Sequence, residues 1–457
     1  MNFETFINGE IDNMIHTLDR LVCIPSVGKD SEYDAPFGKE ALSALEEVVK
    51  IASEMGLCAH IYHNRVAVID LYPAPFPTVG ILTHADVVPA GNGWTYEPFK
   101  VTKNGENLYG RGVIDNKGPI VSTLYAMKYA KEYLSLNNNF RLIVGSDEER
   151  GSSDLSYYMA NQKLPEYVFT PDANYPVINT EKGRATGNFT KKITYTTDKK
   201  VLSATGGTVI NAVPDRAYAT VCGYELHELY MASDACSALV KYEFIEKADN
   251  ITEITVYGTS AHASLPENGE NALTALCELF SKLDYQWENI YNACPHNDVY
   301  AKAIKADCED EISGKLTFSF DLLEFDGENF KGTFDVRFPV CLTVQELKQK
   351  LTDGLNRFGL NLEDYSAVPP HHTNSDSLLV KALLAAYETV TGKPGKPLAV
   401  GGGTYAHGIP GAVAFGPEFN EIDNKIHGAD EFISLEHFKI NTSMIYNAML
   451  KLDEQIV

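Results

Sequence analysis

The first part of the chain, up to about residue 184, alternates between segments of helical periodicity and short, continuous apolar runs. Apolar residues recur every three or four positions in residues 40–56 and 120–134, as expected for helices that pack on a core. The continuous apolar runs are residues 65–72, 78–88, 140–149 and 166–176. Such strands, alternating with helices, are typical of parallel sheets. We therefore predict an α/β domain with a mostly parallel sheet that helices cover on both faces.

A different pattern follows, in which apolar and polar residues alternate with a period of two. It occurs in residues 188–200, 215–224, 250–264 and 315–340, with helix-like segments at 271–283 and 343–359. This alternation indicates antiparallel strands, and hence a separate α+β domain. The α/β pattern returns near residue 375 with a helix, a glycine-rich turn and a strand. We predict one domain made of residues 1–184 and 373–457, interrupted by an inserted domain at 185–372.

Composition narrows the functional classes. The chain has 457 residues, 44% hydrophobic and 22% charged, which is ordinary for a two-domain globular protein. Its net charge of -24 disfavours binding to nucleic acid or to an anionic membrane surface. The first 21 residues predict an amphipathic helix and no signal peptide. The eight cysteines form no C-x-x-C pair, so we expect reduced, mostly buried thiols and a cytoplasmic protein.

Ionisable side chains follow four of the apolar strands, and another lies in a glycine-rich loop. In α/β sheets the carboxyl ends of the strands converge, and ligands bind there. Taken singly, each of these side chains has an ordinary explanation as a solvated loop residue, a turn cap or a surface histidine. Their joint placement at strand ends is what indicates a common site. The residues are His84, Asp86, Asp115, Glu148, Glu149, Asp172 and His427.

Two imidazoles together with several carboxylates suit borderline divalent cations, with Zn²⁺ preferred and Mn²⁺ or Co²⁺ as alternatives. The number of candidate ligands suggests two ions that share a bridging carboxylate. His84 and Asp86 are two positions apart on one face of an extended chain, so Asp86 can support the imidazole from behind. Glu148 and Glu149 are adjacent, so their side chains diverge. One carboxylate can bind a metal while the other faces the attacking water.

The motifs that carry these residues resemble those of a known family. They are H-A-D-V-V-P, G-R-G-x-x-D-N-K-G-P, D-E-E, P-D and a late histidine. The motifs and their order resemble those of the acetylornithine deacetylase / succinyl-diaminopimelate desuccinylase / carboxypeptidase G family of dinuclear metallohydrolases. Within that family, they are most similar to those of the bacterial dipeptidase V branch. The resemblance covers essentially the full length of the chain. It implies the catalytic domain of that family, which is formed by the N-terminal and C-terminal parts of the chain.

The resemblance also implies roles for the ligands. His84 and Asp172 would hold one metal, Glu149 and His427 would hold the other, and Asp115 would bridge them.

Glu148 would be the general base toward a water between the two metals, and Asp86 would give support behind His84. The family usually has a cis peptide after its bridging aspartate, so the bond between residues 115 and 116 is expected to be cis.

The inserted domain resembles the lid of the family, through the motif G-x-S-A-H-x-S. The resemblance implies that His262 stabilises the oxyanion, that Arg337 binds a substrate carboxylate and that Asn211 is a neutral donor. The turn "GGGTYAHG" lacks the Lys-Ser/Thr of a nucleotide-binding loop, so we expect Gly402 and Gly403 to contact substrate through the backbone. On residue pattern alone, a turn histidine, an edge-strand arginine and a loop asparagine would be the simpler reading.

The function implied is metal-dependent hydrolysis of the amide bond of an unblocked dipeptide by a metal-bridging hydroxide. An N-acyl amino acid deacylase of the same family is the alternative, because both enzymes cut an amide beside a free carboxylate. A catalytically silent protein that binds metal or peptide is a third hypothesis. The presence of Glu148 argues against this third hypothesis, since loss of the general base is the simplest way for such an enzyme to become inactive.

The length of the insertion leads to a prediction about quaternary structure. In the family, short lids often pair with a neighbouring subunit that lends residues to the active site. The insertion at 185–372 is long enough to hold two lid-like halves, so we predict a functional monomer. Multi-angle light scattering at assay concentration should give the mass of one chain, and a stable dimer would contradict the prediction.

Overall fold

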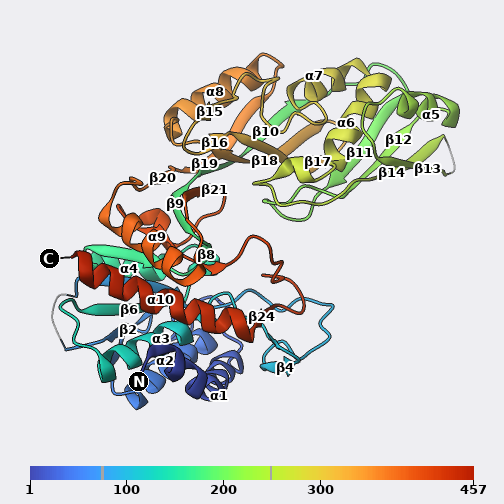
Figure 1. The fold of residues 1–457 in the computed structure, drawn as a ribbon. Coiled ribbons are helices and arrows are strands. Elements are labelled where there is room, and N and C mark those ends of the chain that lie inside the picture. The colour runs from blue at the N-terminus through green and yellow to red at the C-terminus, as the bar shows by residue number, and fades with distance from the viewer. Residues whose placement is uncertain (74–76, 248–249, 457) are drawn as a thin grey trace. The chain divides into compact units, whose positions relative to one another are not determined.

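The computed structural model describes residues 1–73, 77–247 and 250–456, which fold into two compact units (Figure 1). Unit 1 comprises Met1–Thr180, His372–Leu398 and Gly403–Val457, and unit 2 comprises Glu181–His371 and Ala399–Gly402. The sequence-based boundaries were 184/185 and 372/373. The main difference is the short segment 399–402, which belongs to unit 2 although the sequence placed it in the α/β domain.

Unit 1 contains a nine-stranded sheet in the order β1-β2-β6-β3-β7-β22-β9-β20, with β21 paired to β9. The four central strands β6, β3, β7 and β22 are parallel, and the outer pairs β1–β2, β2–β6 and β22–β9 are antiparallel. The predicted α/β class is confirmed, with parallel pairing in the centre of a mixed sheet. The strands are β1 Cys58–Tyr62, β2 Val66–Asp70, β3 Val79–His84, β6 Phe140–Gly145, β7 Tyr167–Thr170, β9 Val177–Glu181, β20 His371–His372, β21 Pro397–Val400 and β22 Val413–Ala414.

Helices cover both faces of this sheet, as expected from its continuously apolar strands. Successive side chains point to opposite faces. Ile81 of β3 accordingly belongs to the large core that also contains the buried residues of five helices, and Leu82 belongs to the smaller core on the other face. The five helices are α1 Phe3–Val22, α2 Lys39–Glu54, α3 Lys117–Tyr133, α9 Leu378–Thr391 and α10 Leu435–Gln455. On the other face lie α4 Ser153–Asn161 and the 3₁₀ turn η3 Tyr405–Gly408.

Two small ladders in unit 1 bring distant loops together. β24 (Phe432–Ser434) pairs with β5 (Asn107–Tyr109), which also pairs with β4 (Thr102–Asn104). β23 (Pro417–Glu418) pairs with β8 (Ala173–Asn174). These ladders place the loops that follow β22 beside the loops that precede α3 and follow β7. Sequence analysis did not anticipate them, because each strand has only two or three residues.

Unit 2 is an antiparallel eight-stranded sheet in the order β13-β14-β12-β11-β17-β18-β10-β19, and its buried residues form a separate hydrophobic core. Its strands are β10 Gly183–Lys192, β11 Lys200–Gly206, β12 Arg216–Cys222, β13 Lys241–Glu246, β14 Ile251–Tyr257, β17 Thr317–Phe325, β18 Asn329–Phe338 and β19 Asn361–Val368, with a hairpin of β15 Glu309–Asp310 and β16 Gly314–Lys315. Its helices are α5 Leu226–Asp234, α6 Ala272–Leu283, α7 Tyr285–Ala293 and α8 Val344–Asn356, with the turn η2 Pro266–Asn268.

Local sequence explains where several helices begin. Thr343 and Glu346 form a reciprocal capping box at α8, and the side chains of Ser377 and Ser434 cap α9 and α10. The helices predicted at 40–56, 271–283 and 343–359 are found as α2, α6 and α8.

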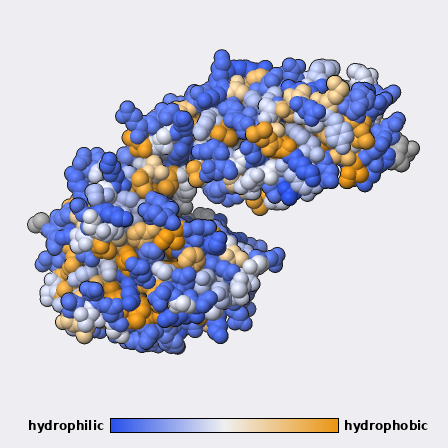
Figure 2. Space-filling model, turned by 45° about the vertical axis from the view of Figure 1, so that its right-hand side comes forward, coloured by the Kyte–Doolittle hydropathy of each residue, from blue (hydrophilic) through white to orange (hydrophobic). Residues whose placement is uncertain are grey.

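The surface shown in Figure 2 is mostly hydrophilic, and hydrophobic residues are scattered over it. In the described part of the chain, no helix combines the length and apolarity needed to cross a bilayer. All eight cysteines are free, but only Cys277 and Cys294 are buried, and Cys23 and Cys341 are exposed. The expectation of mostly buried thiols is therefore wrong, because most of these cysteines lie at the ends of strands and helices and not in a core.

Candidate metal centre and active site

The sheet of unit 1 delivers the predicted ionisable residues to one place. His84 is the last residue of β3, and Asp172 follows β7 by two residues. Glu148 and Glu149 begin the 3₁₀ turn η1 (Glu148–Arg150), which follows β6. β6, β3 and β7 are adjacent and parallel, so their carboxyl ends meet at one edge.

Asp115 lies between the two predicted imidazoles, with one oxygen directed to each. Its Oδ1 is 3.0 Å from Nε2 of His84, and its Oδ2 is 2.9 Å from Nε2 of His427. Nε2 of His427 is also 3.2 Å from Oε1 of Glu149. A carboxylate whose two oxygens face different imidazoles has the arrangement needed to bridge two cations. The peptide bond between Asp115 and Asn116 is cis, as predicted.

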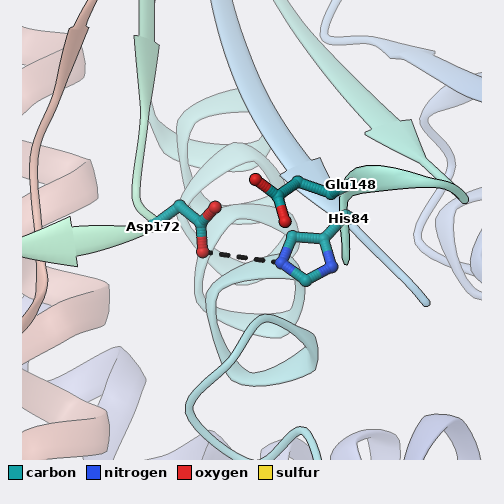
Figure 3. Close-up of side chains that lie close together, drawn as sticks. All are labelled: His84, Glu148 and Asp172. Carbon is teal, nitrogen blue, oxygen red and sulfur yellow. Dashed lines mark ion pairs between the residues drawn. The ribbon is translucent and has the colours of Figure 1, made fainter. Parts of the chain in front are cut away.

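The remaining carboxylates complete two overlapping groups of candidate ligands. One group is His84, Glu148 and Asp172, and the other is His84, Asp115 and Glu149, with the ligand atoms of each group within 4.8 Å of one another. In Figure 3, the carboxylates of Glu148 and Asp172 both point toward the imidazole of His84, and Oδ1 of Asp172 is 3.5 Å from Nε2. Imidazole and carboxylate donors at these separations fit borderline divalent cations.

Asp86 lies behind His84, as predicted, and also makes contacts that were not predicted. Nδ1 of His84 is 3.0 Å from the backbone oxygen of Asp86 and 3.5 Å from its carboxylate. The carboxylate also accepts the backbone N–H of Glu148 at 3.3 Å and that of Glu149 at 3.1 Å. Asp86 therefore contacts the imidazole and, through its side chain, holds the turn of the two glutamates.

The electrostatics of the cluster favour bound positive charge. Burial acts to lower the pKa of His84, but the surrounding carboxylates, Asp172 foremost, raise it well above its usual value. Hydrogen bonds with Asp115 and Glu149 raise the pKa of His427 to about 10. Burial acts to raise the pKa of Asp115, and the bonds from both imidazoles hold it below its usual value. The same negative field that retains protons on two histidines would attract metal cations once those protons leave.

The carboxyl groups of Glu148 and Asp172 behave differently from that of Asp115. Burial first, and the charge of Asp172 second, raise the pKa of Glu148 well above its usual value. Burial also raises the pKa of Asp172 to about 6. A carboxyl group whose pKa lies closer to neutrality is better matched to accepting and returning a proton at neutral pH.

A buried ion pair ties the Asp115 loop to the His427 loop. Arg111 donates from Nη1 to Oε2 of Glu431 at 2.7 Å, and both side chains are almost completely inaccessible to solvent. The other oxygen of Glu431 accepts the backbone N–H of Gly112 at 3.0 Å and those of two further loop residues. Glu431 lies four residues after His427, so one carboxylate fixes both loops that flank the centre.

A pocket with about 600 Å³ of open space lies at the cluster. Besides the acidic cluster residues and His427, it is lined by Ile114, Gly403, Pro417, Glu418 and Ile426. Gly403 was predicted to contact substrate. Burial, together with the charges of Asp115 and Asp172, raises the pKa of Glu418 to about 7.

The other predicted residues belong to unit 2, where the structure brings Asn211 and His262 together. The backbone oxygen of Asn211 accepts the N–H of Ala263 at 2.9 Å, and its N–H donates to the buried carboxylate of Asp321 at 2.8 Å. Asn211 has a φ of 85°, a left-handed conformation that asparagine tolerates better than most residues. The imidazole Nδ1 of His262 is 2.6 Å from the hydroxyl of Ser264.

Arg337 is buried and already has a carboxylate partner. Its Nε and Nη2 donate to the two oxygens of Asp335 at 2.7 and 3.0 Å, and Nη1 donates to the backbone oxygen of Gly401 at 2.6 Å. Gly402 is the next residue along this turn and belongs to the same unit. The bidentate pair orients the guanidinium rigidly. It also means that Arg337 is not left without a counter-charge when no substrate carboxylate is bound.

Sequence analysis missed several charged residues of these sites, among them Asp335, Glu431 and Glu418. Asp335 stands two positions before Arg337 in a strand, so the i, i+2 rule that linked His84 to Asp86 could have found it. Glu431 stands at the end of the segment "HGADE", but only its complete burial distinguishes it from a surface glutamate. Glu418 carries no local signal, because the pairing of β23 with β8 places it.

Comparison with known proteins agrees with this geometry. The sequence profile described as peptidase family M20/M25/M40 matches residues 80–451. The putative dipeptidase YtjP of Bacillus subtilis (strain 168) is 29% identical over 465 residues, which cover 99% of this chain and 100% of the relative. The beta-Ala-Xaa dipeptidase of Lactobacillus delbrueckii subsp. lactis is 28% identical over 470 residues, and the alignment covers both chains completely.

Solved structures share the fold at low sequence identity. Human carnosine dipeptidase 1 aligns with a TM-score of 0.58 and 16% identity, covering 99% of this chain and 98% of that one. The dipeptidase Dug1p of Saccharomyces cerevisiae aligns with a TM-score of 0.59 and 13% identity, with the same coverage. The profile match spans most of the chain, including every candidate metal ligand. The chain therefore belongs to the M20/M25/M40 family of peptidases.

Proposed function

We propose that this peptidase is a metal-dependent dipeptidase that hydrolyses the amide bond of unblocked dipeptides, within the dipeptidase V branch of the acetylornithine deacetylase / succinyl-diaminopimelate desuccinylase / carboxypeptidase G family. The observation that carries the proposal is the Asp115 carboxylate, whose two oxygens face His84 and His427. The names of the relatives, beta-Ala-Xaa dipeptidase among them, support a dipeptide as the substrate class.

The donor set fits two divalent ions, with Zn²⁺ preferred and Mn²⁺ or Co²⁺ as alternatives. In this proposal His84 and Asp172 would hold one ion, Glu149 and His427 would hold the other, and Asp115 would be shared between them. When bound, such ions act as Lewis acids toward the scissile carbonyl and make the attacking water more acidic.

Glu148 is the proposed general base. It takes a proton from the attacking water and returns that proton to the leaving amine. Burial raises the pKa of Glu148 above its usual value, which favours the protonated form needed for the second transfer. The backbone N–H of Glu148 is bonded to Asp86, which limits the motion of the turn during both transfers.

Unit 2 is the proposed lid, and its residues act on the substrate. The imidazole of His262 would donate to the developing oxyanion, and its bond to Ser264 would orient the ring. Arg337 would bind the substrate carboxylate with N–H groups that Asp335 and Gly401 do not use. Asn211 and the backbone of Gly402 would contribute neutral donors. From unit 1, Gly403 would present its backbone to the substrate in the pocket.

Replacing the bridging residue tests the number of metals. Asp115→Ala should lower metal content more than His84→Ala or Asp172→Ala, because it removes one bond from each ion. The measurement is elemental analysis of gel-filtered protein, with circular dichroism to show that the variant folds. Two full equivalents of metal in folded Asp115→Ala would contradict a bridging role. Chelation should abolish activity, and Zn²⁺, Mn²⁺ or Co²⁺ should restore it.

Replacing the proposed base tests the proton transfers. Glu148→Gln keeps the size of the side chain but cannot accept the proton. Turnover should fall by about 10²–10⁴-fold while both metals are retained. The readouts are kcat for a dipeptide and metal content in the same preparation. If turnover stays near that of the wild type, Glu148 is not the base.

A substrate panel tests the proposed function itself. The four compounds are one dipeptide, its C-terminal amide, its N-acetyl form and a tripeptide extended by one residue. The free dipeptide should have the highest kcat/KM. The amide should lose about 10- to 100-fold, as expected when a hydrogen bond between two charged groups is removed. This loss is moderate because Asp335 still neutralises Arg337.

The panel also separates the alternatives. Preference for the N-acetyl compound would assign the chain to the deacylases. Equal rates for the dipeptide and its amide would show that Arg337 does not bind the substrate carboxylate. Rapid cleavage of the tripeptide would contradict a site limited to dipeptides. The absence of any hydrolysis by fully metal-loaded protein would favour a silent binding protein.

A further inference from the structure

Glu418 stands out among the residues that line the pocket of unit 1. It is half-buried at the end of β23, and the same pocket is lined by Asp115, Asp172 and His427. Within the described ranges 1–73, 77–247 and 250–456, its carboxylate has neither a hydrogen bond nor an ion pair. In the described part of the chain the carboxylate of Glu148 also makes no hydrogen bond or ion pair, but Glu148 belongs to a group of candidate metal ligands. Glu418 lines the same pocket without such a role to explain its position.

The backbone of Glu418 is paired in a short ladder, so the fold fixes the point at which its side chain leaves the main chain. The N–H of Tyr175 donates to the backbone oxygen of Glu418 at 2.8 Å, and Glu418 stands opposite Asn174 in the β8–β23 ladder. Asn174 comes two residues after Asp172. The ladder therefore fixes Glu418 beside the segment that delivers one of the proposed metal ligands.

Glu418 is not among the candidate metal ligands. It belongs to neither group of residues whose donor atoms lie close enough to share an ion, and in the described part of the chain its carboxylate makes no contact like those of His427 with Asp115 and Glu149. Its main electrostatic neighbours are the carboxylates of Asp115, Asp172 and Asp423, together with His427, whose charge opposes theirs. The proposed ions would neutralise the first two carboxylates. A partly desolvated carboxylate without a partner is stabilised by a cation that enters the pocket.

We propose that Glu418 binds the free α-ammonium group of the substrate and thereby selects unblocked dipeptides. The inference rests on the proposed dipeptidase function and names the residue that would recognise the amino end. A dipeptide brings an ammonium group into this pocket, whereas an N-acyl amino acid has an uncharged acyl chain at the same position. The acyl compound forms no ion pair with Glu418, so this one side chain would favour dipeptides over N-acyl amino acids as substrates.

The test compares two substrates that differ only in the amino group. Alanyl-leucine carries it, and propionyl-leucine is the same molecule without it. In Glu418→Gln, kcat/KM for alanyl-leucine should fall by about 10- to 100-fold, the loss typical of a charged hydrogen bond. The value for propionyl-leucine should change less than threefold. If propionyl-leucine is not cleaved, its inhibition constant against alanyl-leucine supplies the same comparison.

Two further variants control for charge and folding. Glu421→Gln makes the same change at an exposed position three residues away, and it should leave both substrates unaffected. Glu418→Asp keeps the charge and should retain more discrimination between the substrates than Glu418→Gln. Metal content should equal that of the wild type in all three variants.

Each outcome bears on a separate claim. An equal loss for both substrates in Glu418→Gln, or loss of metal from it, would overturn the assignment of Glu418 while leaving the dipeptidase proposal intact. Failure of the wild type to cleave alanyl-leucine would instead overturn the proposed function.

Discussion

The buried carboxylate of Asp115, which faces one imidazole with each oxygen, is the constraint on which the rest of the site depends. His84 is completely inaccessible to solvent, and several carboxylates surround it within hydrogen-bonding or ion-pair distance. Removing so many charges from water is costly unless opposite charges compensate them. Protons on the two histidines offer partial compensation, and divalent ions shared by the same atoms offer more. The geometry is therefore that of a site built to be occupied by cations.

The surrounding structure keeps these like-charged groups close to one another. The parallel strands β3, β6 and β7 end at one edge and bring His84, the two glutamates and Asp172 together. Asp86 then fixes the glutamate turn through two backbone hydrogen bonds. Glu431 performs the corresponding task for the loops of Asp115 and His427. In each case a carboxylate accepts backbone N–H groups, which offset part of its negative charge close to the centre.

Recognition of the two substrate ends would follow different physical rules in the two units. Arg337 is held in a bidentate pair with Asp335, so its orientation is set before substrate binds and its charge is already balanced. Glu418 has a fixed backbone and a carboxylate without a partner, so its interaction energy becomes available only when a cation arrives. Selectivity at the amino end would therefore rest more on charge, and selectivity at the carboxyl end more on hydrogen-bond geometry.

The sequence by itself determined the α/β class, the insertion and the identity of the residues that gather in unit 1, because apolar periodicity and the strand-end rule are local signals. It also singled out the peptide bond after Asp115 through the family resemblance. The C-terminal helix α10, the short strand β24 and the pairing of β8 with β23 were not anticipated, although β23 and β24 place Glu418 and Glu431. Tertiary structure alone decided that the carboxylate of Asp86 binds backbone N–H groups, that Arg337 is paired with Asp335 and that Glu418 faces the pocket. These contacts depend on which chain segments become neighbours, and a two-residue ladder or a buried ion pair leaves no periodic trace in the sequence.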